Sequence, residues 1–230
     1  MAMAPELVVA LDVPALEEAR RLVALLRPTV RWFKVGMELF TAAGPAAVEA
    51  VRAEGWVVLL DLKLHDIPHT VAGAVRSAAR LEAEMLTLHL AGGAAMIRAA
   101  VDAARDACTG LHLVGIAHLT SEPAASAEFA WSVAETALGA ADLGLDGVVV
   151  SVHEAAAVRA ACRPGFLIVA PGIRPAGASA DDQARVATPA EAVRAGCDFI
   201  VVGRPIVRAF DPLQAAIAIT REMTALGAPV

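Results

Sequence analysis

Short aliphatic runs alternate along this chain with longer stretches in which apolar residues, many of them alanine, recur at helical spacing. Such runs are typical of buried strands, and a period near 3.6 residues is typical of amphipathic helices. The runs predict strands at Leu7 to Val13, Arg31 to Met37, Val57 to Lys63, Met85 to Ala91, His112 to Leu119, Gly147 to Val152, Phe166 to Ile173 and Phe199 to Ile206. Helices are predicted to begin near Pro14, Thr41, Pro68, Gly93, Ser126, His153 and Thr188, and a last one at Asp211, where a capping residue precedes proline.

Strand followed by helix, repeated eight times, is the order of elements in an α/β fold of the (β/α)8 TIM barrel type. The length of 230 residues agrees with a single barrel domain spanning residues 1–230, because such barrels reach roughly 200 to 250 residues. A doubly wound open sheet is the alternative. The turn after the first strand, DVPALEEA, contains no GxGxxG, which argues against a dinucleotide-binding site there.

The stretch from Val57 to Thr70, VVLLDLKLHDIPHT, places ionisable groups at the end of an otherwise apolar strand. Because side chains alternate along a strand, Asp61, Lys63 and His65 are expected on one face and the two intervening leucines on the other. The following proline favours the first turn of a helix and puts Asp66 close to its capping position. A carboxylate and an ammonium group are therefore predicted to point the same way.

In a (β/α)8 barrel the active site lies at the carboxyl ends of the strands. The polar side chains expected at these ends are Asp12, Lys34, Asp61, Lys63, His89, Thr120, Ser121, Arg174 and Arg204. Only two of the 19 basic residues are lysine, Lys34 and Lys63, and both belong to this set. An ammonium group has a tunable pKa and can deliver a proton, whereas a guanidinium stays charged. The two lysines are therefore expected at positions where arginine could not serve.

Composition excludes several classes of function. A formal net charge of -6 without a basic tract gives no electrostatic footprint for nucleic acid. No apolar run reaches the ~18 residues of a membrane-spanning helix, and the N-terminal MAMAPELVVALDVP lacks the basic region of a signal peptide, so we expect a cytoplasmic protein. Cys108, Cys162 and Cys197 lie outside any CxxC pattern and are expected to be reduced core thiols.

Asp12, Lys34, Asp61 and Lys63 alternate in sign, and close packing of such groups keeps lysines charged and carboxylates ionised. This arrangement suits the delivery of a proton to carbon. A salt-bridge network that only closes the top of the barrel is the alternative, and it is disfavoured because buried ion pairs are a poor source of net stability. Asp66 is a weaker member, since it could serve as a helix cap alone.

Two segments after the seventh and eighth strands, Pro171 to Pro175 (PGIRP) and Val201 to Ile206 (VVGRPI), contain glycine and arginine. Loops at these places in barrels often bind phosphate, because glycine allows close approach of the backbone and arginine grips the dianion. We therefore predict a phosphate site, with two arginines merely at the barrel rim as the alternative. Ala176 to Thr188, small, polar and long for a connection, is predicted to be a lid.

A metal site is the other possibility for the charged strand end. His65 and His69 flank Asp66 and could bind a divalent cation together with Asp61. The break between strand and helix removes regular spacing between the histidines, and neighbouring lysines compete electrostatically with a metal ion. We therefore expect no metal.

These motifs resemble those of the orotidine 5'-phosphate decarboxylase family. DLKLHDIPHT resembles the family signature DxKxxDIPxT. ALDVP, FKVGMELF, HLTS, APGIRP, DDQ and VVGRPI resemble further family segments, in the expected order and over nearly the whole chain. The resemblance implies conversion of orotidine 5'-phosphate to UMP and carbon dioxide, without a metal or an organic cofactor.

The resemblance also implies roles. Lys63 would protonate C6 of the pyrimidine, Asp61 would lie beside the departing carboxylate, and Lys34 would contact Asp61 and the ribose. The other substrate-binding residues it implies are Asp12 for the ribose, Thr120 for the pyrimidine, and Arg174, Gln183, Gly203 and Arg204 for base and phosphate. Asp66, Ile67 and Thr70 would reach across a homodimer interface into the partner's site.

Two other functions remain open. A related group of magnesium-dependent barrels, the 3-keto-L-gulonate 6-phosphate decarboxylases and hexulose-phosphate synthases, also carries DxKxxD, although DIPHT and the PGIRP to DDQ region argue against it. From another class, a non-catalytic protein that binds phosphoribosyl ligands would use both lysines only as ligands.

Overall fold

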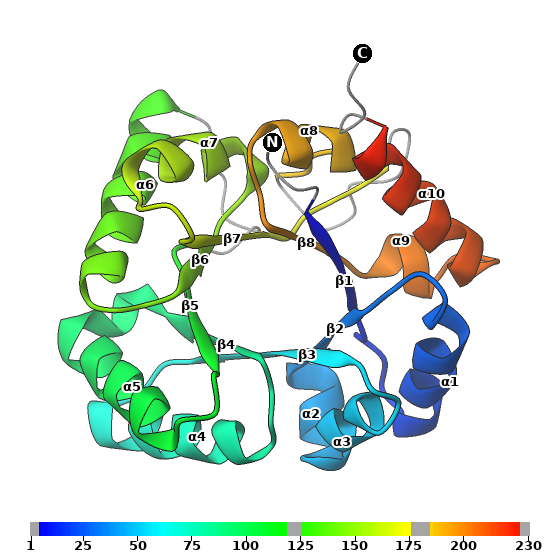
Figure 1. Cartoon of the computed structure of the whole chain (residues 1–230), viewed down its shortest axis with the longest axis horizontal. Coiled ribbons are helices and arrows are strands. Elements are labelled where there is room, and N and C mark those ends of the chain that lie inside the picture. Colours follow the sequence, from blue (N-terminus) through cyan, green and yellow to red (C-terminus); the bar gives the residue numbers. More distant parts are fainter. Residues whose placement is uncertain (1–4, 119–125, 176–184, 226–230) are drawn as a thin grey trace.

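The computed structural model describes residues 5–118, 126–175 and 185–225. In this part of the chain, parallel strands close into a barrel in sequence order, from β1 to β8, and β8 pairs with β1 (Figure 1). The predicted (β/α)8 barrel is confirmed, and the open sheet is excluded. The strands are β1 (Glu6–Ala10), β2 (Trp32–Gly36), β3 (Val57–Leu64), β4 (Met85–His89), β5 (His112–Ile116), β6 (Gly147–Val149), β7 (Leu167–Ala170) and β8 (Phe199–Val202).

The helices surround the ring of strands on its outer side (Figure 1). They are α1 (Leu16–Leu26), α2 (Met37–Ala43), α3 (Ala46–Arg52), α4 (Pro68–Arg80), the 3-10 turn η1 (Leu90–Gly92), α5 (Gly93–Ala107), α6 (Ala127–Asp142), α7 (Val152–Ala161), α8 (Pro189–Arg194), α9 (Arg204–Val207) and α10 (Pro212–Thr224). Within the described residues, none of these helices has the length and apolar character needed to cross a membrane.

The observed strands are shorter than the hydrophobic pattern predicted, except for β3, which continues one residue further, to Leu64. β8 ends at Val202 instead of Ile206, because Gly203 caps α9 and a proline stands in the first turn of that short helix. The second helix begins at Met37 and not near Thr41, and Gly44, at a φ of 60°, ends it. Apolar residues thus continue beyond the strands into the helix starts.

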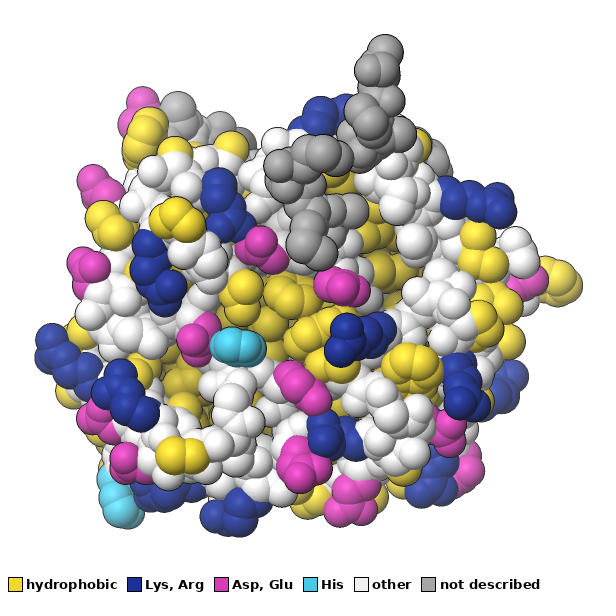
Figure 2. Space-filling view, viewed as in Figure 1, with side chains coloured by type: hydrophobic (Ala, Val, Ile, Leu, Met, Phe, Trp, Pro, Cys, Tyr) yellow, Lys and Arg dark blue, Asp and Glu magenta, His cyan; other side chains and the backbone are white. Residues whose placement is uncertain are grey.

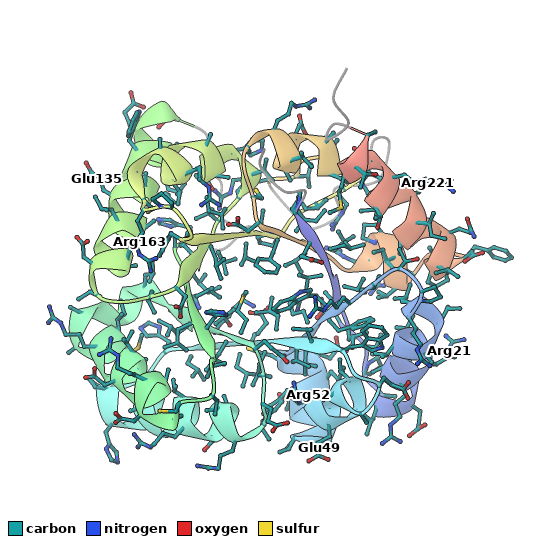
Figure 3. All side chains as sticks on the ribbon, viewed as in Figure 1. Arg21, Glu49, Arg52, Glu135, Arg163 and Arg221 are labelled. Atoms are coloured by element: carbon teal, nitrogen blue, oxygen red, sulfur yellow. The ribbon has the colours of Figure 1, made fainter. Side chains whose placement is uncertain are left out.

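Alternation along the strands divides the apolar side chains between two cores. Outward-facing residues of β4, Leu86 and Leu88, belong to the large core between strands and helices, while Met85 faces the barrel interior. Figure 3 shows side chains filling the space inside the ring. The interior core is made by Val8, Ala10, Leu59, Met85, Val114, Ile116, Val149, Val169 and Val201. The barrel is therefore packed along its axis, as is usual for this fold.

The cysteines do not all belong to the core. Cys162 and Cys197 are buried, as predicted, but Cys108 is exposed, which corrects the expectation for this residue. Cys108 follows α5 in a left-handed conformation, with a φ of 52°, where the chain turns at the surface.

Acidic side chains brace the end of the barrel at which the strands begin. Glu84, Asp146 and Asp198 precede β4, β6 and β8, and their carboxylates accept backbone N–H groups of the preceding strands. The donors are Val58, Leu113 and Ile168, at 2.7, 2.8 and 2.7 Å. Figure 2 shows a face on which apolar side chains at the centre are ringed by acidic and basic ones. The hydrogen bonds from these backbone N–H groups to the three carboxylates fix neighbouring strands against each other.

Each of these carboxylates has a basic side chain beside it. Arg52 pairs with Glu84 and Arg159 with Asp198, whereas the basic partner of Asp146 is a histidine, His112. His112 Nδ1 lies 3.6 Å from Asp146 Oδ1. The hydrogen bond with Asp146 raises the pKa of His112 above its ordinary value, although partial burial opposes this. Partial burial opposes ionisation of Asp146, but His112 and the Leu113 N–H hold the pKa of this carboxyl below its usual range.

Asp146→Asn is expected to lower the free energy of unfolding more at about pH 5.5 than at about pH 8.5. A raised histidine pKa contributes stability that is complete below the unfolded value, near 6.5, and is lost as the pH rises through the folded value. The depressed Asp146 pKa contributes equally at both pH values, since both lie above the unfolded carboxyl pKa. The difference should stay under about 1 kcal/mol, because the pair is partly exposed.

Urea unfolding at the two pH values measures this difference. In a His112→Gln background, Asp146→Asn should cost the same at both values, because the titrating partner has been removed. An equal cost at both pH values in the unmodified background contradicts the prediction.

Candidate active site

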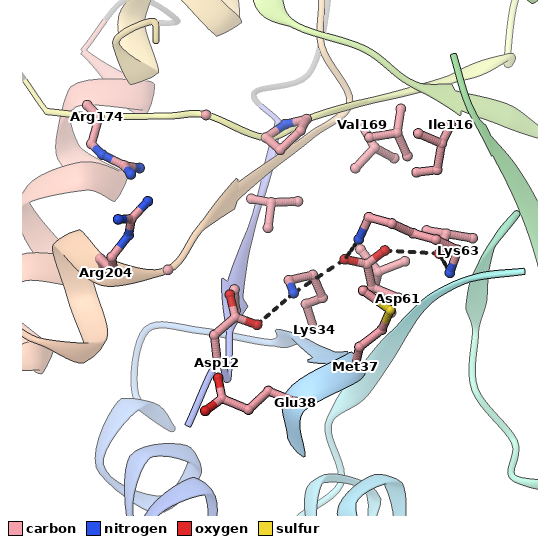
Figure 4. A pocket seen from close by; sticks show the side chains of 18 of the residues that line it. Asp12, Lys34, Met37, Glu38, Asp61, Lys63, Ile116, Val169, Arg174 and Arg204 are labelled. Atoms are coloured by element: carbon pink, nitrogen blue, oxygen red, sulfur yellow. Dashed lines mark hydrogen bonds and ion pairs between the residues drawn. The ribbon is translucent and has the colours of Figure 1, made fainter. Parts of the chain in front are cut away.

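A cavity of about 550 Å³ opens where the strands end (Figure 4). The predicted site residues that line it are Asp12, Lys34, Asp61, Lys63, Arg174, Gly203 and Arg204. They come from segments spread over most of the chain, and the closed barrel brings them to one rim because all its strands are parallel.

Four charged side chains form a continuous chain of alternating sign across this cavity (Figure 4). Lys34 Nζ donates to Asp12 Oδ1 at 2.8 Å and lies 3.3 Å from Asp61 Oδ2. Lys63 Nζ donates to the same Asp61 oxygen at 2.7 Å. Asp61 therefore stands between two ammonium groups.

Burial and opposite charge together set the ionisation of the two central groups. Lys34 is 9% exposed and Asp61 is 7% exposed. Burial by itself would lower the pKa of Lys34, but the carboxylates of Asp61 and Asp12 outweigh it, and the pKa is raised above its ordinary value. Burial likewise opposes ionisation of Asp61, but Lys34 and Lys63 hold its pKa below the usual range. Both groups are thus charged at neutral pH.

Two guanidinium groups lie on the other side of the cavity. Arg174 and Arg204 point toward one another there, well apart from Lys63 (Figure 4). The backbone around Arg174 is fixed, since its N–H donates to Ala187 O at 2.9 Å and the Ala187 N–H donates to Gly172 O at 3.2 Å. Two neighbouring arginines, one of which has its backbone fixed in this way, suit a dianion such as phosphate.

The model of the orotidine 5'-phosphate decarboxylase / HUMPS family matches residues 5–219. The chain belongs to this family. A protein of Moorella thermoacetica named orotidine 5'-phosphate decarboxylase is 48% identical over 231 residues, which covers 95% of this chain and 92% of that protein. A protein of the same name from Anaeromyxobacter sp. (strain K) is 52% identical over 217 residues, covering 91% of this chain and 94% of that protein.

The structures agree with the sequences. The crystal structure of orotidine 5'-phosphate decarboxylase from Lactobacillus acidophilus has a TM-score of 0.80 and 34% identity, and the match covers 95% of this chain and 99% of that one. The family description joins orotidine 5'-phosphate decarboxylases with HUMPS enzymes, so it does not by itself separate the two groups that the DxKxxD motif left open. The names of the curated relatives favour the first group.

The DIPHT part of the family signature lies outside the cavity of its own chain. Asp66, Ile67 and Thr70 are exposed and are not among the residues that line the cavity. Asp66 does not cap α4 either: Ile67 is the N-cap residue, without a side-chain bond, and the Asp66 carboxylate accepts the Ile67 N–H at 2.6 Å. The capping role considered from the sequence is therefore wrong.

His65 does not share the cavity with Asp61 and Lys63, contrary to the strict alternation predicted from the sequence. Its ring lies 5.5 Å from the ring of His89. The backbone of Lys63 has a φ of 49°, so the regular strand geometry is interrupted at Lys63 itself. Beyond that residue, successive side chains no longer point to opposite faces of the sheet in strict alternation.

Several predicted features fall outside the described residues. They are Thr120, Ser121, Gln183 and most of the predicted lid from Ala176 to Thr188. Besides the aliphatic side chains of the strands, the cavity has lining residues that the sequence analysis did not single out as site residues, among them Met37, Glu38, Thr87, His118 and Arg208. Met37 and Glu38 stand inside the FKVGMELF segment, whose position directly after a strand could have indicated them.

Arg185 and Glu154 form a buried ion pair that sequence reasoning also missed. Arg185 Nη1 donates to Glu154 Oε1 at 2.7 Å, and the Arg185 guanidinium lies 5.7 Å from the centre of the Phe129 ring. The other Glu154 oxygen accepts the Ser151 N–H at the start of α7. The pair thus joins the chain just before Ala187 to α7 and supports the backbone bridge beside Arg174.

Within the described part of the chain, no group of three or more His, Cys, Asp or Glu side chains is arranged to hold a metal ion. Asp61 has two ammonium groups within 3.3 Å of one oxygen, where a divalent cation would meet like charge.

Proposed function

We propose that this protein decarboxylates orotidine 5'-phosphate, producing UMP and carbon dioxide. The observation that carries the proposal is a single cavity with Lys63 and Asp61 on one side and two arginines on the other. Such a cavity suits a ligand whose reacting ring and phosphate lie at opposite ends. The names of the curated relatives support the same substrate.

The reaction breaks the bond between C6 and the carboxyl carbon, and the electron pair stays on C6 as carbon dioxide leaves. The Lys63 ammonium stabilises the negative charge that develops there, and Lys63 Nζ then donates its proton to C6. Asp61 faces the departing carboxylate and holds Lys63 Nζ at 2.7 Å. Solvent returns a proton to the lysine. No metal ion or organic cofactor takes part in this sequence.

The rest of the cavity positions the substrate. Lys34 and Asp12, which bond to each other at 2.8 Å, would bind the ribose hydroxyl groups. Arg174 and Arg204 would hold the phosphate, and Gly203 leaves room beside them. Binding energy from this remote group can be used to orient the reacting ring. Thr120 and Gln183 would contact the base from segments beyond the described residues.

The functional assembly in this proposal is a homodimer. Ile67 is 66% exposed, which is unusual for a large aliphatic side chain, and it stands between Asp66 and Thr70, both also exposed. A partner subunit would cover this apolar residue. Asp66 and Thr70 would then complete the partner's active site, while Asp61 and Lys63 serve their own subunit.

The direct test is to incubate the purified protein with orotidine 5'-phosphate in EDTA and to follow the loss of the orotate absorbance and the formation of UMP. Equal rates in EDTA and in magnesium are expected. Strict dependence on magnesium would favour the hexulose-phosphate synthase group, and UMP binding without turnover would indicate a non-catalytic binding protein.

Arg204→Ala is expected to raise the KM for orotidine 5'-phosphate about 10- to 100-fold, because hydrogen bonds to a charged group contribute roughly 1.5 to 3 kcal/mol. UMP should inhibit the variant correspondingly more weakly, whereas inhibition by uridine, which lacks the phosphate, should not change. Arg221→Ala is the matched control, since Arg221 lies on the outer side of α10 (Figure 3). An equal loss of affinity for UMP and uridine would show that Arg204 does not recognise phosphate.

A further inference from the structure

Thr87 is the uncharged polar exception among the strand residues that line the cavity. It lies on β4 and is 1% exposed. The other uncharged strand residues in the described lining are all aliphatic, namely Ala10, Leu59, Ile116, Val149, Val169 and Val201. Valine would fit this inner surface without any polar group to satisfy, so the hydroxyl at position 87 calls for an explanation.

The Thr87 hydroxyl contacts both residues at the centre of the proposed reaction. Thr87 Oγ1 donates to Asp61 Oδ1 at 2.9 Å and accepts the Lys63 backbone N–H at 2.9 Å. The other Asp61 oxygen, Oδ2, is the one that faces both Lys63 and Lys34. Thr87 therefore fixes the rotation of the carboxylate that presents one oxygen to the two ammonium groups.

The backbone at this point is irregular. The pairing of β3 with β4 shifts register between Leu60 and Leu64, and Lys63 between them has a left-handed φ of 49°. An L-residue other than glycine rarely adopts this conformation. The side chain of Thr87 accepts the Lys63 N–H inside this irregular step, where regular pairing is interrupted.

We propose that Thr87 is a positioning residue, whose hydroxyl holds the Asp61 carboxylate and the Lys63 backbone in the arrangement that directs the Lys63 ammonium to C6. The inference rests on the decarboxylase function proposed above. Thr87 has a stiff, β-branched side chain in a packed barrel, which suits it to fix a neighbouring strand. It acts through Asp61 and Lys63 and does not touch the reacting atoms itself.

Two variants separate the hydroxyl from the shape of the side chain. Thr87→Val keeps the shape and removes both hydrogen bonds, and it is expected to lower kcat about 10- to 100-fold with KM within about threefold, since small displacements of reacting groups cost up to ~100-fold. Thr87→Ser keeps the hydroxyl and should stay within about threefold of the unmodified kcat. Thr220→Val, which removes a hydroxyl that donates to Ala216 O within α10, is the matched control.

The pH profile gives a readout that a purely structural role would not change. Thr87 is among the groups that hold the pKa of Asp61 below its usual range, after the two lysines. Loss of its hydrogen bond should move the acidic limb of kcat to higher pH in Thr87→Val but not in Thr87→Ser. If the valine variant does not fold, as judged by its melting curve, Thr87→Ala is measured by the same readouts.

An unchanged kcat and acidic limb in Thr87→Val would overturn the inference, as would equal losses in the valine and serine variants. The unmodified protein, assayed in parallel with orotidine 5'-phosphate, tests the function separately. Its failure to form UMP would defeat the proposed function, whereas normal turnover with an unaffected valine variant would defeat only the role of Thr87.

Discussion

Lys63→Ala is expected to lower kcat by about 10⁴-fold while UMP still binds. A general acid contributes roughly 10²- to 10⁴-fold, and stabilisation of developing charge contributes roughly 10²- to 10³-fold. In the proposed mechanism Lys63 supplies both, because its ammonium group would stabilise the charge on C6 and then protonate that carbon. UMP should bind because Arg174 and Arg204, on the other side of the cavity, are untouched.

The measurement is the loss of orotate absorbance, with UMP affinity determined by calorimetry on the same sample. Asp61 keeps Lys34 at 3.3 Å in this variant, so its charge retains a partner and the barrel should stay folded. Lys63→Arg is the informative companion: it keeps the charge but holds its proton too firmly, and it should also be strongly impaired. Substantial residual turnover by Lys63→Ala would remove the lysine from the role assigned to it.

The fold was predictable because a barrel imposes the same pattern on every unit. Buried strands of four to eight aliphatic residues and helices of period 3.6 are local features, and their eightfold alternation has few architectural solutions. The strand ends were less predictable. Residues such as Ile206 are buried whether they stand in a strand or in the first turn of the next helix, so hydrophobicity alone does not show where β8 stops.

Much of the site followed from the same topology. Parallel strands bring their carboxyl ends to one rim, so Asp12, Lys34, Asp61 and Lys63 could be placed together before any distance was known. Lysine usage sharpened this, since both lysines of the chain meet at Asp61.

Other parts of the site depend on geometry that sequence patterns do not encode. Thr87 looks in the sequence like any β-branched strand residue, and its function as a hydrogen-bonding residue arises from the register shift between β3 and β4. The same irregular step turns His65 away from the cavity. The pairing of Arg185 with Glu154 joins residues 31 positions apart in sequence, and nothing in either segment indicates the other.

Asp66→Asn and Lys63→Ala subunits, each nearly inactive alone, are expected to recover about a quarter of the unmodified activity when mixed in equal amounts. The reason is the proposed homodimer, in which the residues of the family signature are divided between two subunits. Random exchange makes about half of the dimers mixed, and each mixed dimer holds one intact site of two, with Lys63 from one subunit and Asp66 from the other. The exposed Ile67 beside Asp66 marks the surface that the partner would cover.

The control is a mixture of Lys63→Ala with Asp61→Asn. Both residues line the cavity of their own chain and bond to each other at 2.7 Å, so no combination of these subunits restores a complete site. Activity should therefore rise in the first mixture and not in the second. Subunit exchange is verified by co-purification of differently tagged chains. Verified exchange without a rise in the first mixture would place Asp66 outside the partner's site, and an equal rise in both mixtures would show that recovery does not depend on sharing the signature between subunits.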